Sequence, residues 1–329
     1  MDWFTAILIA SGALCVVVIF NVNRKNFTMK DPRSPMRFHG YAKNLNQNGG
    51  LRKRVILLHH GFVATSALPI VVWSVRILSK VFRSWSNYSI LCVFPPGFGG
   101  TTHLEKMYQD RTIERGRFYL YALPEARALQ AQGVTHVICI GLSMGANSIA
   151  KVASVLSAGN RTKIEAVITF EGLFEKMSPE RLKSRFVDPV GAFIKRLRLK
   201  FGFGRKMIVR LTNRGNIRML AMEILPMFLP WKKRAIDAYN RMLAETTLKQ
   251  DLQVLASRGV PILVVYADES TLTRREIYAE VRELGSSKAP FQVMEVSDTH
   301  LGLTNDPWKF SRIAARFARE ILIMGKTRI

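Results

Sequence analysis

The sequence predicts an α/β fold: a mostly parallel, doubly wound sheet with helices on both faces. Short, continuous apolar runs recur along the chain, and helical patterns separate most of them. Strands of a parallel sheet are buried on both faces, so their sequences are unbroken apolar runs. The 329 residues are also enough to bury one substantial core and to carry an insertion. A helical lid insertion and an N-terminal transmembrane helix complete the predicted architecture.

Six apolar runs are the predicted strands. They are residues 55–58, 89–94, 136–140, 166–170, 261–266 and 291–296. The helical patterns include residues 114–132, 272–284 and 307–323. We therefore expect the α/β core to comprise residues 54–172 and 246–329.

The first segment is a candidate membrane anchor. Residues 3–22 contain no charged residue, and about 20 apolar or small residues can span a hydrocarbon core. A cleaved signal peptide is one alternative, but it would need positive side chains before the apolar run, where the only charged side chain is that of Asp2. A buried core helix is the other, although a run that is apolar on every face at the start of the chain disfavours it. We expect residues 1–23 to be a retained, single-pass anchor.

A basic stretch with prolines and glycines follows the apolar segment. Between residues 21 and 54 it carries nine Lys or Arg and a single acid, Asp31. Positive residues remain on the cytoplasmic side of a membrane, so the catalytic domain is predicted there. We interpret residues 24–53 as a linker that would also bind anionic lipid.

A long region without strand patterns interrupts the alternation. Residues 195–218 within it carry nine basic residues and no acid, with Phe and Leu side chains between them. One interpretation is a helical insertion with a solvated basic face. The other is a basic, amphipathic lid that lies on the membrane. The predicted anchor favours the lid, which we assign to residues 173–245.

The formal net charge of +25 predicts an anionic neighbour. A membrane surface is the expected partner, because the chain contains no nucleic-acid-binding motif. Cys15, Cys92 and Cys139 are dispersed within apolar runs, which indicates reduced cysteines and not a disulfide framework or a metal site. The oligomeric state does not follow from the sequence.

Residues 141–145 carry the most informative motif. They read Gly-Leu-Ser-Met-Gly, between an apolar run and a stretch of small, helix-compatible residues. Strand, sharp turn and helix is the context of a nucleophile elbow, which exposes the serine hydroxyl above the sheet. Gly141 and Gly145 would let the strand and the helix pack closely. The alternative is a glycine-flanked Ser143 in an ordinary βα loop.

A serine hydroxyl is a weak nucleophile and needs a base. Of six histidines, His300 follows the last predicted strand and should therefore lie at the same carboxyl edge of the sheet as Ser143. The order serine, acid, histidine along the chain is typical of an elbow serine. We predict that His300 is the base.

These motifs resemble the α/β-hydrolase fold superfamily, from about Arg54 to the C-terminus. The matching stretches are residues 57–62 (Leu-Leu-His-His-Gly-Phe), 96–100 (Pro-Gly-Phe-Gly-Gly), the elbow, and His300 with the Asn-Asp-Pro-Trp of residues 305–308. Within the superfamily, residues 143–147 with Lys151 resemble a branch of N-terminally anchored acylglycerol and phospholipid hydrolases. The resemblance implies an oxyanion hole from the backbone N–H groups of Met144 and Phe62.

The position of the acid departs from the superfamily's usual Gly-x-x-Asp after the penultimate strand. Here that stretch contains Asp268-Glu269-Ser270. Strict alignment places Ser270 at the acid position, and a shift of one or two residues gives Glu269 or Asp268. Glu171, just after an earlier strand, is a further candidate because some members keep their acid there. We favour Asp268, with Glu269 and Glu171 as alternatives; each could instead be a loop carboxylate that caps a helix.

The resulting hypothesis is a membrane-anchored serine hydrolase that cleaves carboxylic esters of apolar acyl groups, such as acylglycerols or phospholipid-like molecules. Ser143 would form an acyl-enzyme with His300 as the base, without a metal or an organic cofactor. One alternative is a thioesterase or peptidase on the same triad. Another is a non-catalytic, membrane-tethered binding protein on a hydrolase fold. Nucleic-acid binding is suggested by the charge alone, so no nucleic-acid partner is expected.

Overall fold

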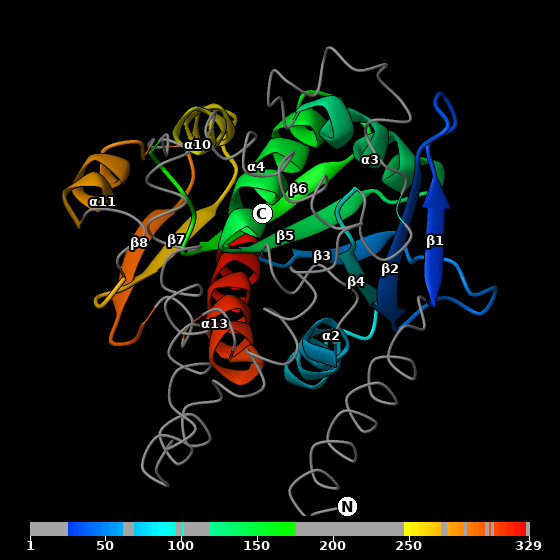
Figure 1. Ribbon diagram of the computed structural model, residues 1–329, viewed down its shortest axis with the longest axis horizontal. Helices are drawn as coiled ribbons and strands as arrows, with labels where there is room; N and C mark the ends of the chain where they lie inside the picture. Colours follow the sequence, from blue (N-terminus) through cyan, green and yellow to red (C-terminus); the bar gives the residue numbers. More distant parts are fainter. Residues whose placement is uncertain are drawn as a thin grey trace, which may run out of the picture.

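The computed structural model describes residues 26–61, 69–96, 101, 119–175, 247–270, 275–285, 288–299, 303 and 306–326 (Figure 1). The predicted anchor and almost all of the predicted lid lie outside these ranges, as do Phe62 and His300. Within them, no helix is long and apolar enough to cross a bilayer.

One sheet of eight strands organises the described residues, in the order β1-β2-β4-β3-β5-β6-β7-β8. The strands are β1 (Phe27–Lys30), β2 (Arg37–Lys43), β3 (Arg54–His59), β4 (Tyr88–Val93), β5 (His136–Leu142), β6 (Lys163–Phe170), β7 (Ile262–Ala267) and β8 (Phe291–Val296). Strands β4-β3-β5-β6-β7-β8 are parallel, whereas β2 is antiparallel to β4 and β1 is antiparallel to β2. The predicted α/β class with a mostly parallel sheet is therefore confirmed.

Helices cover both faces of the sheet, as Figure 1 shows. They are α2 (Pro69–Val81), α3 (Tyr119–Ala131), α4 (Met144–Ser157), α10 (Leu248–Ser257), α11 (Arg275–Arg282) and α13 (Pro307–Lys326). Alternate residues of β3 enter different cores: Val55 and Leu57 pack with the layer of α3, α4, α10 and α11. Ile56 and Leu58 pack with the layer of α2 and α13. Because successive side chains of a strand point to opposite faces, a strand between two helical layers must be apolar throughout.

The prediction that residues 24–53 form a linker is wrong in part, because these residues contain β1 and β2. Phe27, Met29 and Phe38 alternate with exposed residues and are buried in the core. This alternation is typical of antiparallel strands with one solvated face. Basic and proline residues between the two strands obscured this alternation in the sequence.

Asp31 holds the turn between β1 and β2 against helix α3. Its buried carboxylate accepts hydrogen bonds from the Arg127 guanidinium, at 2.9 and 2.6 Å, and from the Ser34 hydroxyl at 2.5 Å. Burial by itself raises the pKa of Asp31, but the hydrogen bonds from Arg127, Ser34 and the Arg33 N–H outweigh it and hold the pKa below its ordinary value. The single acid of a basic stretch thus fastens that stretch to the core.

Replacing Asp31 by Asn should destabilise the protein. The substitution leaves Arg127 facing a neutral amide, and we expect the free energy of unfolding at pH 7 to fall by about 2–4 kcal/mol. Because the pKa of Asp31 is lower in the folded protein than in the unfolded protein, the wild type is more stable than the variant by the full amount above about pH 4. This difference in stability is lost as the pH falls through the pKa of Asp31 in the folded protein. Urea unfolding followed by tryptophan fluorescence at pH 7 and pH 3 measures both effects. Glu283→Gln, at an exposed carboxylate, is the matched control, and equal losses in the two variants would contradict the assignment.

Candidate active site

Ser143 occupies a one-residue turn between β5 and α4. Its φ of 54° and ψ of −125° lie in a region that residues with a side chain rarely adopt. The Ser143 N–H donates to the carbonyl oxygen of Phe170, at the end of the neighbouring strand β6, over 2.7 Å. The strand, turn and helix that the motif predicts are therefore present, with the backbone strain expected of an elbow.

The two elbow glycines are required by packing. A Cβ atom on Gly141 would stand 2.5 Å from the Cα of Ala146, and one on Gly145 would stand 2.1 Å from the carbonyl oxygen of His59. Helix α4 thus lies directly against the ends of β5 and β3. Since Met144 is the first residue of α4, its N–H belongs to the first turn, whose N–H groups have no carbonyl partner inside the helix. This is the N–H predicted to contribute to an oxyanion hole.

The end of β3 lies beside Ser143. A Cβ atom on Gly61 would stand 3.1 Å from the Ser143 Cβ and 3.7 Å from its Oγ. The Gly61 N–H donates to Nδ1 of His60 over 2.9 Å, and burial lowers the pKa of His60 to about 3. His60 is therefore a neutral, structural histidine at physiological pH.

His59 fastens this turn to two helices of the layer above it. Its Nδ1 lies 2.7 Å from Oγ of Ser148 in α4, and its Nε2 lies 2.7 Å from Oε1 of Glu125 in α3. All three side chains are buried. His59 is thus more than part of a His-Gly motif, because its contacts cross-link the end of β3 to α3 and α4.

Asp268 and Glu269, two of the three candidate acids, lie in an exposed turn after β7. Oδ1 of Asp268 accepts a hydrogen bond from the Asp298 N–H over 2.9 Å, and this bond is the main reason why the pKa of Asp268 is lowered. The Glu269 N–H donates to the Asp298 carbonyl oxygen over 3.1 Å. These contacts tie the loops after β7 and β8 together.

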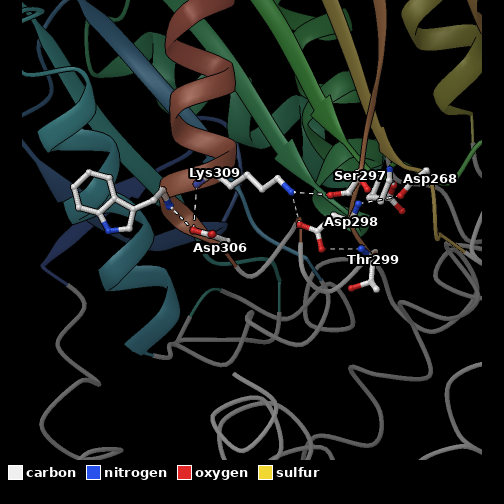
Figure 2. Close-up of polar contacts among 9 residues, drawn as sticks. Asp268, Ser297, Asp298, Thr299, Asp306 and Lys309 are labelled. Carbon is white, nitrogen blue, oxygen red and sulfur yellow. Dashed lines mark hydrogen bonds and ion pairs between the residues drawn. The ribbon is translucent and has the colours of Figure 1, made fainter. Parts of the chain in front are cut away.

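Figure 2 shows how this loop network continues to α13. The ammonium group of Lys309 donates to Oδ2 of Asp298 over 2.6 Å and to the Ser297 carbonyl oxygen over 3.2 Å. Asp306 caps α13 by accepting from the N–H groups of Trp308 and Lys309. The segment that leads into residue 300 is thus held from both sides.

Glu171, the third candidate, is buried directly after β6. Its backbone has a positive φ of 56°, and its N–H donates to the Val265 carbonyl oxygen over 2.8 Å. One carboxylate oxygen accepts from the Ala267 N–H, and the other accepts from the Ser270 hydroxyl over 2.5 Å. Ser270, which stands where strict alignment expects the acid, therefore binds a carboxylate that comes from the adjacent strand.

Glu171 also follows the residue whose carbonyl oxygen accepts from the Ser143 N–H, Phe170. The side chain of Asn147, one turn into α4, holds the chain after Glu171 by exchanging two hydrogen bonds with the backbone of Leu173, at 2.8 and 3.1 Å. This clamp was not predicted from the sequence, although an amide side chain four residues after the serine, in a helix of mostly small and apolar residues, was a usable signal. Among the described residues, no group of three or more His, Cys, Asp or Glu could hold a metal ion.

Solved structures share this architecture. A carboxylesterase from Nitrososphaera gargenis superposes with a TM-score of 0.59 at 13% identity, over 90% of this chain and 99% of the other. A thermophilic esterase from Thermogutta terrifontis superposes with a TM-score of 0.55 at 16% identity, over 90% and 98%. The enol-lactonase of Burkholderia xenovorans LB400 gives 0.57 at 16% identity, over 86% and 97%. No protein-family model and no curated protein matches the sequence.

At these identities the similarity establishes the fold alone. The chain has the α/β-hydrolase fold, as the resemblance in its motifs implied. Ser143 follows β5, which lies in the middle of the sheet between β3 and β6, and the elbow helix α4 begins directly after it.

Gly145 provides a test of the elbow geometry. We expect Gly145→Ala to lower the free energy of unfolding by about 1–3 kcal/mol, because the new methyl group collides with backbone that cannot move without shifting β3. Thermal unfolding measured by circular dichroism reports the change. Gly159→Ala is the control, since its nearest contact would be 3.9 Å away; a Gly145→Ala protein as stable as this control would refute the packing.

Proposed function

We propose that this protein is a membrane-anchored serine hydrolase that cleaves carboxylic esters of apolar acyl groups, with acylglycerols or phospholipid-like molecules as substrates. The observation that carries the proposal is the strained turn at Ser143, which is hydrogen-bonded to the end of β6 directly before the buried Glu171. Strain of about 1–3 kcal/mol persists only where the surrounding structure enforces it, and such residues cluster at active sites.

Glu171 is the acid in this proposal, in place of Asp268. A triad acid must hold the correct histidine tautomer and stabilise the imidazolium, which a buried, hydrogen-bonded carboxylate does well. Glu171 is 1% exposed and is oriented by Ala267 and Ser270. Asp268 is exposed and already binds the Asp298 backbone.

The chemistry follows the roles that these groups can take. Ser143 attacks the acyl carbonyl carbon, while His300 accepts the hydroxyl proton and passes it to the leaving alcohol. The N–H groups of Met144 and Phe62 stabilise the oxyanion of the tetrahedral intermediate; each such donor lowers the barrier by a few kcal/mol. Water then releases the acid from the acyl-enzyme by the same proton transfers in reverse.

The membrane location and the lipid preference rest on sequence. Residues 3–22 contain no charge, and the region from 195 to 218 is basic with interleaved aromatic residues. An anchor and a lid of this kind would place the catalytic domain at the cytoplasmic surface of a membrane. Apolar acyl chains are the substrates available there.

Removing the nucleophile tests the enzymatic part. We expect Ser143→Ala to lower kcat for p-nitrophenyl butyrate by at least about 1,000-fold, because removing a triad serine leaves only residual binding and oxyanion stabilisation. Initial rates by absorbance, together with an unchanged thermal unfolding curve, provide the measurement. Ser86→Ala, at an exposed serine of a surface turn, is the matched control.

Undiminished turnover in Ser143→Ala would remove this residue from the mechanism. Failure of the wild-type protein to react with a fluorophosphonate probe would favour a non-catalytic binding protein. Faster turnover of an acyl-CoA or a peptide than of a monoacylglycerol would favour a thioesterase or a peptidase on the same triad.

Two carboxylate substitutions identify the acid. We expect Glu171→Gln to lower kcat by about 1,000- to 10,000-fold, because an amide neither enforces the histidine tautomer nor stabilises the imidazolium. Asp268→Asn should change kcat by less than about tenfold, because Asp268 binds only loop backbone. Steady-state kinetics of both variants give the comparison, and the opposite ranking would assign the role to Asp268.

A further inference from the structure

Helices α2 and α13 share an outer face that has an unusual composition. The two helices lie together on one side of the sheet (Figure 1), and Arg319 of α13 donates to the Val81 carbonyl oxygen at the end of α2 over 3.4 Å. Their exposed residues recur at helical spacing. The residues of this α2–α13 face are Trp73, Arg76, Lys80, Trp308, Arg312, Arg316 and Arg319.

Charge is strongly unbalanced on this side of the molecule. Helices α2 and α13 contain seven Lys or Arg and one acid, Glu320, which is 3.1 Å from Arg316. The helices α3, α4, α10 and α11 on the opposite side contain five basic and four acidic residues. Among the helices that cover the sheet, the basic excess is therefore confined to one side; residues 26–54 form a separate basic stretch.

Two tryptophans lie at the end of this face that is nearest the site. Trp73 is 38% exposed and Trp308 is 37% exposed. Each lies near the start of its helix, and both helices follow strands that end at the carboxyl edge of the sheet, where Ser143 lies. The Arg312 guanidinium lies 5.5 Å from the centre of the Trp308 ring. Indole side chains partition to the boundary between lipid headgroups and acyl chains, and guanidinium groups bind lipid phosphates.

We infer that the α2–α13 face docks on an anionic lipid bilayer and so places the carboxyl edge of the sheet beside the bilayer surface. Six basic side chains at the headgroup level would each contribute attraction, counting Arg83 just after α2, which is also exposed. The two indoles would enter the boundary next to the site. A nucleic-acid duplex would bind the basic residues, but its bases are already stacked on one another and offer no partner for the pair of exposed indoles at the site end.

Docking itself does not require that Ser143 is catalytic. The expected effect of docking on ester hydrolysis rests on the proposed function. The experiment uses the full chain in vesicles of phosphatidylcholine, prepared with or without about 30% phosphatidylserine. The anionic lipid gives the vesicle a negative surface potential. The test variant is Arg76→Glu with Arg312→Glu. The matched control is Arg161→Glu with Lys163→Glu, which makes the same change in charge at an exposed residue just before β6 and at the exposed first residue of β6.

The first readout is quenching of tryptophan fluorescence by phosphatidylcholine that is brominated on its acyl chains, in the Ser143→Ala protein. When Trp73 and Trp308 are both present, part of the quenching should require phosphatidylserine. This part should disappear in the double variant Trp73→Phe, Trp308→Phe. The Arg76→Glu, Arg312→Glu pair should reduce the docking equilibrium constant at least about tenfold, and the control pair should leave it within about twofold. Equal behaviour of the two pairs would overturn the inference.

The second readout is turnover by the protein with Ser143 intact. The test pair should lower hydrolysis of a long-chain ester in phosphatidylserine vesicles at least about fivefold and leave p-nitrophenyl butyrate hydrolysis in solution unchanged. If the quenching results are as expected but the protein hydrolyses no ester, the proposed function is rejected and the docking inference stands. Loss of duplex DNA binding in the test pair with unchanged quenching would assign the face to a nucleic acid and overturn the inference.

Discussion

The backbone turn at Ser143 is the constraint on which the arrangement of the site depends. Its φ of 54° and ψ of −125° are unfavourable by about 1–3 kcal/mol and persist only if the surroundings hold them. The surroundings do so through the Phe170 carbonyl oxygen, which accepts from the Ser143 N–H, and through the close approach of α4 to the strands at Gly141 and Gly145. The relative positions of β3, β5 and β6 are therefore linked to the direction in which the serine side chain points.

Two carboxylates at this edge of the sheet have different environments because they leave different strands. Glu171 follows β6, turns inward at a positive φ, and is enclosed by Ala267 and Ser270. Asp268 follows β7, remains exposed and binds the Asp298 N–H. Burial with satisfied hydrogen bonds preserves a fixed orientation, whereas an exposed carboxylate is screened by water. The same edge thus contains one carboxylate suited to orient a catalytic group and another that holds loops together.

Charge in this protein is distributed by face. The helices α3, α4, α10 and α11 on one side of the sheet carry nearly balanced charges that include the partly buried pair of Lys151 with Asp251, at 2.7 Å. Helices α2 and α13 on the other side carry a basic excess with two partly exposed indoles. Both helices begin at the edge of the sheet where Ser143 lies. The surface that would orient this protein on a bilayer would therefore also set how a substrate reaches the serine.

The sequence by itself determined the fold class, the six parallel strands and the elbow, because these depend on apolar runs and on glycines within a few residues of Ser143. It did not reveal β1 and β2, whose alternating pattern was masked by basic and proline residues. Nor could it distinguish the environments of the candidate acids, since burial and hydrogen bonding are properties of the folded chain. Glu171 meets Ala267 and Ser270 across 96 and 99 residues of sequence. Only the parallel pairing of β6 with β7 brings them together, and so only the tertiary structure decided which of the candidate carboxylates is buried.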